Sequence, residues 1–210
     1  MKPADHSVDR LAAWLGREIS AEAHHKLELF ATWLVDEAAQ LGGIGQSETN
    51  RVWDRHVLDS AVFAKDLAPE SMLLDVGSGV GLPGVPIAIL HPGPVTLLDR
   101  SERRTDALQR ICAVLDLDVV VIHRDVAALA DRFDRVTMRA SLTLDEARRR
   151  APQLCTAGGE LWFGLGRGVA PLALAAWACG ESPENLEETL ISVPSGVLDS
   201  PAWLLRMTPT

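Results

Sequence analysis

The sequence predicts an α/β protein in which a mostly parallel sheet is flanked by helices and an N-terminal helical cap packs on it. Three observations support this prediction. Short apolar runs alternate with helix-length segments between residues 71 and 179, which is typical of parallel strands joined by crossover helices. The first 70 residues show only helical periodicity. A glycine-rich turn, VGSGVGLPG, directly follows the first apolar run.

The N-terminal 70 residues are expected to contain two helical segments. Apolar side chains recur at helical spacing over residues 8–41, which predicts one helix that Gly42-Gly43 ends. The polar stretch 43–50 is expected to be a loop, and residues 52–67 are again helical in pattern. We therefore divide the chain into a cap, 1–70, and a sheet-containing part, 71–210.

The sheet-containing part alternates regularly and then changes character. Strands are expected at 71–76, 94–99, 118–122, 134–138 and 159–165, and helices near 85–90, 102–115, 126–131, 143–155 and 169–179. Two final apolar runs, 186–193 and 203–207, have no helical segment between them. They predict a long-looped antiparallel pair at one edge of the sheet.

Composition excludes several classes of protein. With 47% hydrophobic and 23% charged residues, the chain resembles an ordinary globular protein. No apolar run reaches the roughly 18 residues of a membrane span, and the N-terminus lacks a secretory signal. The three cysteines are far apart, so we expect buried thiols in a reducing compartment. The prediction is a cytoplasmic, metal-free protein without a membrane partner, and a monomer is favoured.

Positive charge is concentrated in one part of an acidic chain. The net charge is −9, yet residues 100–150 carry 11 basic and 9 acidic side chains and form the only positive section. Of the 20 basic residues 17 are arginines, whose planar guanidinium group suits phosphate and carboxylate ligands. The alternative is that these arginines lie on solvated helix faces.

The glycine turn indicates a nucleotide-like ligand, because glycine lets a ligand approach the backbone at a helix N-terminus. Gly79, Gly81 and Gly84 fit the dinucleotide spacing G-x-G-x-x-G, and Asp99 lies 18 residues past Gly81, near the ribose-binding position. The glycines begin earlier, however, at Gly77. A dinucleotide, a different cofactor and a turn that only packs helix on strand all remain open at this point.

Acidic residues follow the ends of three expected strands and favour S-adenosylmethionine (SAM). Asp75 precedes the first glycine, where it would repel a pyrophosphate but attract the cationic amino acid moiety of SAM. Asp99 follows the second strand. Asp125 follows the third, where it would accept a hydrogen bond from an adenine amino group. A cationic cofactor that carries a ribose and an adenine matches all three acids.

Four stretches carry a resemblance to a known family: DVGSGVGLPGVPIAILHP, VTLLDRSERR, FDRVTMRA and, upstream, RHVLDS. Over about residues 25–165 the chain resembles the GidB (RsmG) family of 16S ribosomal RNA guanine-N7 methyltransferases. The resemblance implies a Rossmann-like class I SAM-dependent methyltransferase sheet with a helical cap, SAM as cofactor and ribosomal RNA as partner. It implies cofactor contacts at Gly77, Gly79, Leu82, Asp99, Asp125, Val126 and Arg139, to which the residue pattern adds Asp75 and Gly81.

The resemblance places Arg139 beside cofactor and substrate. At the end of a strand, its guanidinium group would hold the cofactor carboxylate or an RNA phosphate. The alternative is an ion pair with a neighbouring acid such as Asp99. Guanine N7 has a lone pair and no proton, so methyl transfer needs positioning and no general base.

The RHVLDS stretch supplies further candidates for the active site. His56, Asp59 and Ser60 share one helical face at spacings of three and four residues. Arg55 and His56 are expected to contact the cofactor region or RNA. The alternative is that this helix docks on the sheet through a buried polar network.

The chain departs from the family pattern where RNA contacts are expected. The N-L-T element is missing from LGGIGQSETN, FGLGRG places Arg167 one position after the usual lysine, and LLRMTPT lacks the family's basic C-terminus. Since phosphate neutralisation supplies much of RNA affinity, two other functions remain open. These are a methyltransferase of the same fold that acts on a small molecule or a protein, and a catalytically silent SAM-binding module.

Overall fold

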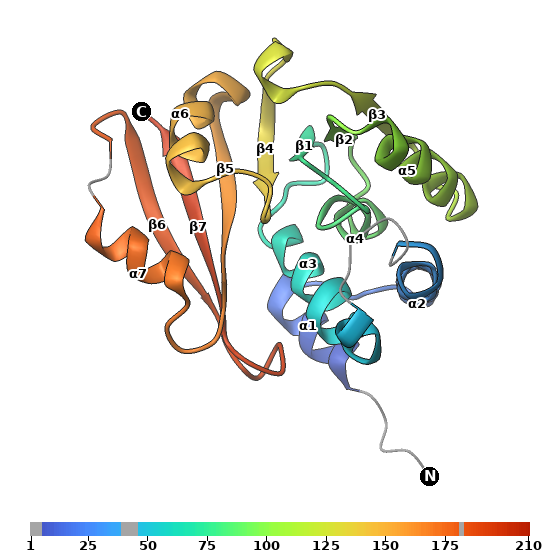
Figure 1. Ribbon diagram of the computed structural model, residues 1–210. Coiled ribbons are helices and arrows are strands. Elements are labelled where there is room, and N and C mark those ends of the chain that lie inside the picture. Colours follow the sequence, from blue (N-terminus) through green and yellow to red (C-terminus); the bar gives the residue numbers. More distant parts are fainter. Residues whose placement is uncertain (1–5, 39–45, 181–182) are drawn as a thin grey trace.

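The computed structural model describes residues 6–38, 46–180 and 183–210, and its centre is one seven-stranded sheet (Figure 1). The strand order is β3-β2-β1-β4-β5-β7-β6. The strands are β1 (Leu73–Val76), β2 (Val95–Asp99), β3 (Val119–His123), β4 (Phe133–Met138), β5 (Cys155–Arg167), β6 (Leu186–Val193) and β7 (Ala202–Pro209). The strand order changes direction between β1 and β4. In open α/β sheets, ligands bind outside the carboxyl ends of strands at such a point.

Strand direction follows the prediction from sequence. The five strands from β3 to β5 pair in parallel. β7 pairs antiparallel with both β5 and β6, which confirms the antiparallel pair expected at the sheet edge. β5 is longer than expected, because it begins at Cys155, directly after a helix.

Helices cover both faces of the sheet (Figure 1). Those after β1 are α4 (Gly84–Leu90), α5 (Glu102–Val114), the 3-10 helix η5 (Val126–Ala128), α6 (Leu144–Leu154) and α7 (Leu172–Cys179). Successive strand side chains point to opposite faces, so Leu97 joins the core beneath α4 and α5 while Leu98 joins the core beneath α6 and α7. Cys112 and Cys155 are buried as expected, but Cys179, the last residue of α7, is exposed.

The N-terminal region corrects one prediction. Residues 8–38 do not form a single helix but α1 (Ser7–Leu15) and α2 (Ala21–Trp33), which a π-helix, η1 (Leu34–Ala38), extends. Gly16 ends α1 in the left-handed conformation, with a φ of 69°. Ser20 caps α2 by accepting a hydrogen bond from the Ala23 amide at 3.1 Å. The expected stop at Gly42-Gly43 lies outside the described residues.

Short helical pieces form the second half of the cap, next to the sheet. They are the 3-10 helix η2 (Gln46–Arg51), the π-helix η3 (Trp53–Leu58), α3 (Asp59–Ala61) and the 3-10 helix η4 (Val62–Ala64). The helical prediction for 52–67 is confirmed to Ala64, whereas residues 46–50 are helical and not the expected loop.

A buried arginine fastens this segment to the sheet. Arg135 of β4 is 2% exposed and donates hydrogen bonds to the carbonyl oxygens of Phe63, Lys65 and Asp66 at 3.2–3.3 Å. It also pairs with the Glu160 carboxylate at 2.7 Å. Because a buried guanidinium needs both charge and hydrogen-bond partners, these contacts fix how the cap meets β4.

Candidate functional site

A cavity of about 850 Å³ opens at the carboxyl ends of β1 to β4. It is lined by Val76 and Gly77 at the end of β1, by Leu98, Asp99, Arg100 and Arg104 around the end of β2, by Arg124, Asp125 and Val126 after β3, by Ala140, Ser141 and Leu142 after β4, and by Glu146, Arg149, Arg150 and Gln153 on α6. Its volume falls within the range of roughly 300–1,000 Å³ typical of small-molecule sites.

Gly77, the first glycine of the turn, lines this cavity. Gly77 has a φ of 71°, and its amide donates to the Leu98 carbonyl oxygen at 2.7 Å. A Cβ at this position would lie 2.5 Å from the Cβ of Ser141, so the turn packs directly against the loop after β4. Only glycine allows both the conformation and the close approach.

Asp99 is held rigidly at the cavity wall. Its side chain is 4% exposed, Oδ2 accepts a hydrogen bond from the Gly79 amide at 2.8 Å, and Oδ1 accepts one from the Ser101 amide at 2.8 Å. The Nη1 atom of Arg104 lies 3.9 Å from Oδ2. Each carboxylate oxygen has two lone pairs, so both retain acceptor capacity toward the cavity.

Asp125 lies on the neighbouring wall and caps η5. Its Oδ1 atom accepts a hydrogen bond from the Ala127 amide at 2.8 Å, while the residue itself is exposed. Val126 follows and also lines the cavity. The structure thus brings Gly77, Asp99, Asp125 and Val126 of the predicted cofactor site into one cavity.

Asp75 takes a different position from the one expected. It is fully buried and does not line the cavity. Its Oδ2 accepts a hydrogen bond from the Gly84 amide at 2.9 Å, and its Oδ1 accepts one from the Thr137 hydroxyl at 3.0 Å. Burial raises the pKa of the Asp75 carboxyl to about 6. Asp75 therefore ties β1 to the end of the glycine turn and to β4.

The other predicted turn residues lie behind the cavity surface. The Gly79 amide points to Asp99, as described above. A Cβ on Gly81, whose φ is 94°, would collide with Val85 of α4. Leu82 is 7% exposed and belongs to the core. These three residues shape the turn, and none is part of the cavity lining.

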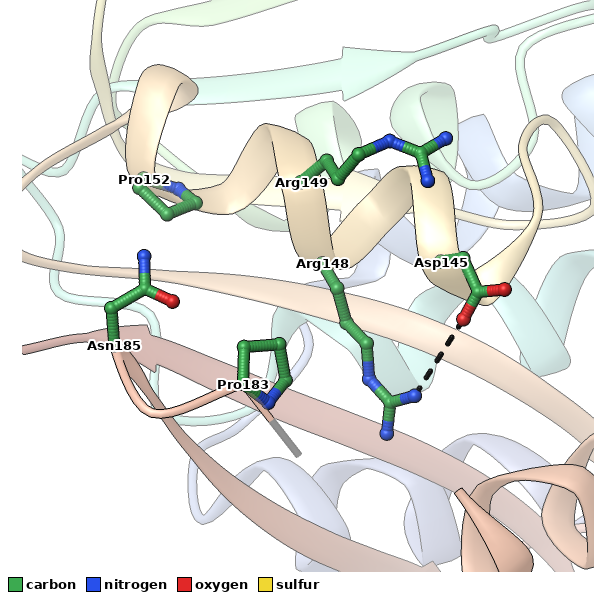
Figure 2. Close-up of a pocket in the computed structure, with 6 residues that line it drawn as sticks. All are labelled: Asp145, Arg148, Arg149, Pro152, Pro183 and Asn185. Carbon is green, nitrogen blue, oxygen red and sulfur yellow. Dashed lines mark ion pairs between the residues drawn. The ribbon is translucent and has the colours of Figure 1, made fainter. Parts of the chain in front are cut away.

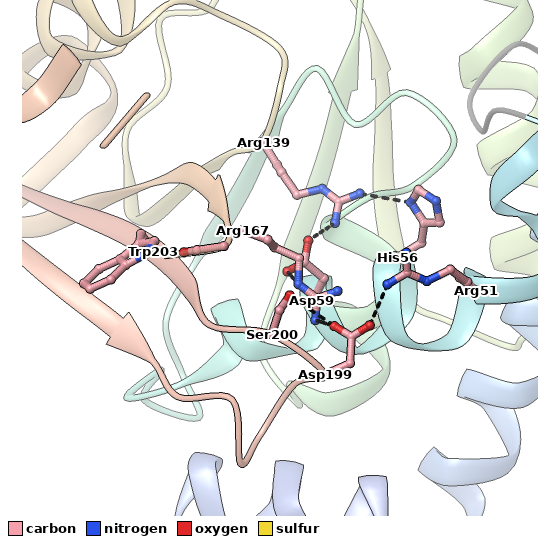
Figure 3. Close-up of polar contacts among 9 residues, drawn as sticks. Arg51, His56, Asp59, Arg139, Arg167, Asp199, Ser200 and Trp203 are labelled. Carbon is pink, nitrogen blue, oxygen red and sulfur yellow. Dashed lines mark hydrogen bonds and ion pairs between the residues drawn. The ribbon is translucent and has the colours of Figure 1, made fainter. Parts of the chain in front are cut away.

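Arg139, after β4, meets the RHVLDS segment (Figure 3). Its Nη1 atom donates to Asp59 Oδ2 at 3.1 Å, and its Nη2 atom lies 3.5 Å from His56 Nδ1. The ion-pair partner is Asp59 and not Asp99, because the side chain extends toward the cap. Burial, and then the charge of Arg139, lowers the pKa of His56, whose Nε2 atom lies 2.9 Å from a Glu48 carboxylate oxygen.

The polar network continues to the C-terminal hairpin (Figure 3). Arg167, at the end of β5, has Nε 3.3 Å from Asp59 Oδ1 and Nη2 2.9 Å from Asp199 Oδ1. Arg51 donates to the other Asp199 oxygen at 2.7 Å. The Arg167 nitrogens are buried and make no well-aligned hydrogen bond to another described residue. Sequence reasoning noted Arg167 but missed Asp199, since no local pattern links them.

The RHVLDS segment therefore joins cap and sheet through polar contacts, as the alternative interpretation expects. His56 and Asp59 both reach Arg139, whereas none of these three side chains lines the cavity. Arg55 is half-buried and also lies outside the cavity lining. Ser60 is fully buried, with a hydroxyl that has no hydrogen-bond partner among the described residues.

A second cavity, of about 490 Å³, lies on the other side of α6 (Figure 2). Its lining includes Arg148 and Arg149 of α6, and Pro183 and Asn185 before β6. Arg148 is 8% exposed and makes two hydrogen bonds to the Glu188 carboxylate, at 2.8 and 2.9 Å. In the parts of the chain that the structure describes, no three His, Cys, Asp or Glu side chains gather as metal ligands, and no helix is long and apolar enough to cross a membrane.

The strand order, and the glycine turn with acids after β2 and β3, define a Rossmann-like class I methyltransferase fold. A ribosomal protein L11 methylase from Lactobacillus delbrueckii subsp. bulgaricus superimposes with a TM-score of 0.55 over 73% of this chain and 77% of that one, at 17% identity.

The sequence comparison is more specific. The model of the GidB family, described as rRNA small subunit methyltransferase G, matches residues 23–167. The ribosomal RNA small subunit methyltransferase G of Thermobifida fusca is 34% identical over 98% of this chain and 87% of its own length. That of Mycolicibacterium smegmatis is 36% identical over 64% of this chain, and the match spans only 60% of its own length. The chain belongs to the GidB family, as the sequence motifs indicated.

Proposed function

We propose that this protein transfers the methyl group of SAM to N7 of a guanine in 16S ribosomal RNA. The observation that carries the proposal is the cavity at the β1/β4 switch point, where Gly77, Asp99 and Asp125 converge. Membership of the GidB family and the methyltransferase names of the relatives support it. Because ribosomal RNA is cytoplasmic, we propose that the protein acts there.

The residues around the cavity fit SAM. Gly77 offers close backbone approach, and the two carboxylates suit the hydroxyl groups of a ribose and the amino group of an adenine. Val126 offers apolar surface beside Asp125. The Ser141 hydroxyl in the cavity wall is buried and has no partner among the described residues, so a polar ligand would satisfy it. Bound there, SAM would supply an electrophilic methyl group on a sulfonium.

Methyl transfer to guanine N7 requires the protein to position the two reactants and requires no general base. N7 attacks with its own lone pair, so the chain must hold the guanine in line with the methyl group and exclude water. His56 has no role as a base in this scheme, because its side chain contacts Arg139 and lies outside the cavity lining. Because the Arg139 side chain pairs with Asp59 and lies outside the cavity lining, we propose that it positions the loop after β4, whose Ala140 and Ser141 line the cavity.

Methylation of 16S RNA tests the proposal directly. Small subunits from a strain that lacks the corresponding methyltransferase would be incubated with the protein and SAM, and the RNA mapped by mass spectrometry. We expect one added methyl group on a guanine. Transfer only to a small molecule or a protein, or SAM binding without any transfer, would overturn the proposal and support one of the two alternative functions.

The cofactor site is tested by Asp99→Asn, which keeps the side-chain shape but replaces an acceptor oxygen with an amide. Loss of a charged hydrogen bond of about 1.5–3 kcal/mol predicts roughly 10- to 100-fold weaker SAM binding in calorimetry. Asp106→Asn, on the exposed side of α5, is the matched control and should bind as the wild type does. Equal affinities of all three proteins would refute the cofactor assignment.

A further inference from the structure

We propose that arginines on two sides of the cavity form the track that binds the RNA backbone. Arg100 and Arg124 follow β2 and β3 on one side, and Arg149 and Arg150 project from α6 on the other. Figure 1 shows α6 and β3 on opposite sides of β4. The inference rests on the proposed function and adds to it the residues that hold the substrate.

The charge balance of the cavity calls for an anionic ligand. Five arginines line it, against three acids, although the whole chain has a net charge of −9. SAM is itself a cation at neutral pH, so it does not account for a surplus of positive side chains. An RNA backbone carries one negative charge per nucleotide and does account for it.

The arginines of the track are available to a ligand. Arg100, Arg124 and Arg149 are exposed, and their guanidinium groups make no ion pair or hydrogen bond with another described residue. Arg150 donates only to the Gln153 amide oxygen, at 2.9 Å. Glu146, one turn earlier on α6, attracts Arg149 and Arg150 electrostatically, but its carboxylate is hydrogen-bonded to Thr143, and no ion pair with either arginine has to be broken before RNA binds.

Arg148 shows the contrast on the same helix. It points toward the Pro183 side of α6, whereas Arg149 extends along a different side of the helix (Figure 2). Arg148 is buried and neutralised by Glu188. Of the three consecutive arginines, Arg148 therefore stabilises the structure, whereas Arg149 and Arg150 line the larger cavity. The sequence pattern alone does not distinguish them.

The start of α6 holds the track in place. Thr143 and Glu146 form a capping box, in which the Thr143 hydroxyl accepts from the Glu146 amide and the Glu146 carboxylate accepts from the Thr143 amide. This fixes the first turn of the helix that carries Arg149 and Arg150. The track also gives a role to the single positive section of the sequence, residues 100–150, in a chain whose net charge is −9.

The double variant Arg149→Gln/Arg150→Gln tests the track. Loss of two phosphate contacts predicts about a tenfold higher KM for RNA, and a log–log salt dependence of RNA affinity that is shallower by about 1.4. The SAM dissociation constant should stay within twofold of wild type, because both residues project from α6, across the cavity from the strand ends that carry Asp99 and Asp125. Arg110→Gln, an exposed arginine of α5 outside the cavity lining, is the matched control.

Each outcome separates the track from the proposed function. Unchanged KM and salt dependence in the double variant, with wild-type methylation intact, would overturn the track alone. A matching loss of SAM affinity would also overturn it, since the arginines would then serve the cofactor. If wild type fails to methylate 16S RNA, the proposed function fails. Fluorescence anisotropy with an rRNA fragment then decides the track: variant-sensitive binding supports it, and binding insensitive to the variant overturns it.

Discussion

Replacing Asp59 with asparagine should destabilise the protein, because one carboxylate serves two guanidinium groups. Asp59 accepts a hydrogen bond from Arg139 at 3.1 Å and lies 3.3 Å from Arg167. The Asp59 and Arg139 side chains are only 17% and 18% exposed. Without the carboxylate, two buried cations face each other with one neutral amide between them.

The magnitude follows from this geometry. Removing one partner of a buried ion pair costs roughly 3–5 kcal/mol, and an asparagine oxygen still accepts one hydrogen bond, so we expect a loss of about 2–3 kcal/mol. At an unfolding entropy of about 2.1 cal/mol/K per residue, this corresponds to a melting temperature lower by roughly 5–7 °C. Arg167 keeps Asp199, which is why a larger loss is not expected.

Thermal and urea unfolding, followed by tryptophan fluorescence, measure the effect in a double-mutant cycle with Arg139→Gln. The double variant should lose less stability than the sum of the single variants, by about 1–2 kcal/mol. Asp106→Asn on the surface is the control and should change stability by less than about 0.5 kcal/mol. Additive losses, or an Asp59→Asn variant as stable as wild type, would show that the ion pair does not join the cap to the sheet.

Two further predictions concern the glycine turn. Because the pKa of Asp75 is raised from 3.8 to about 6 in the folded protein, its contribution to stability is present at low pH and lost as pH rises through 6. Urea unfolding should therefore show that the free energy of unfolding of Asp75→Asn, relative to that of wild type, rises by about 2 kcal/mol between pH 4.5 and 7.5. A difference in stability between the two proteins that does not change with pH would contradict this. Gly77→Ala should weaken SAM binding at least tenfold, since its Cβ would displace the loop after β4. Gly158→Ala has a similar positive φ of 78° but open space around it, so it should cost stability without affecting SAM, and equal effects of the two variants on SAM affinity would refute the argument.

Local patterns in the sequence determined the class of fold, and four of the nine residues predicted to contact a cofactor line one cavity. Apolar runs that alternate with helical segments require crossovers, and crossovers make strands parallel. The carboxyl ends of parallel strands meet at one edge, so Gly77, Asp99 and Asp125 had to converge. Their positions depend on where each strand ends, which is a local property. The prediction of one long N-terminal helix was wrong for a local reason as well. Gly16 ends one helix and Ser20 begins the next, but the continuous apolar periodicity hid these two signals.

Only the tertiary structure decided which charged groups meet. Arg139 pairs with Asp59, 80 residues away, and Arg167 lies between Asp59 and Asp199. Asp75 precedes the turn in sequence, yet the packing of α4 and β4 around it gives its carboxylate internal partners and leaves it outside the cavity. Sequence periodicity reports which face of an element is apolar. The partner of a buried charge depends on how separate elements pack, and no single element encodes that.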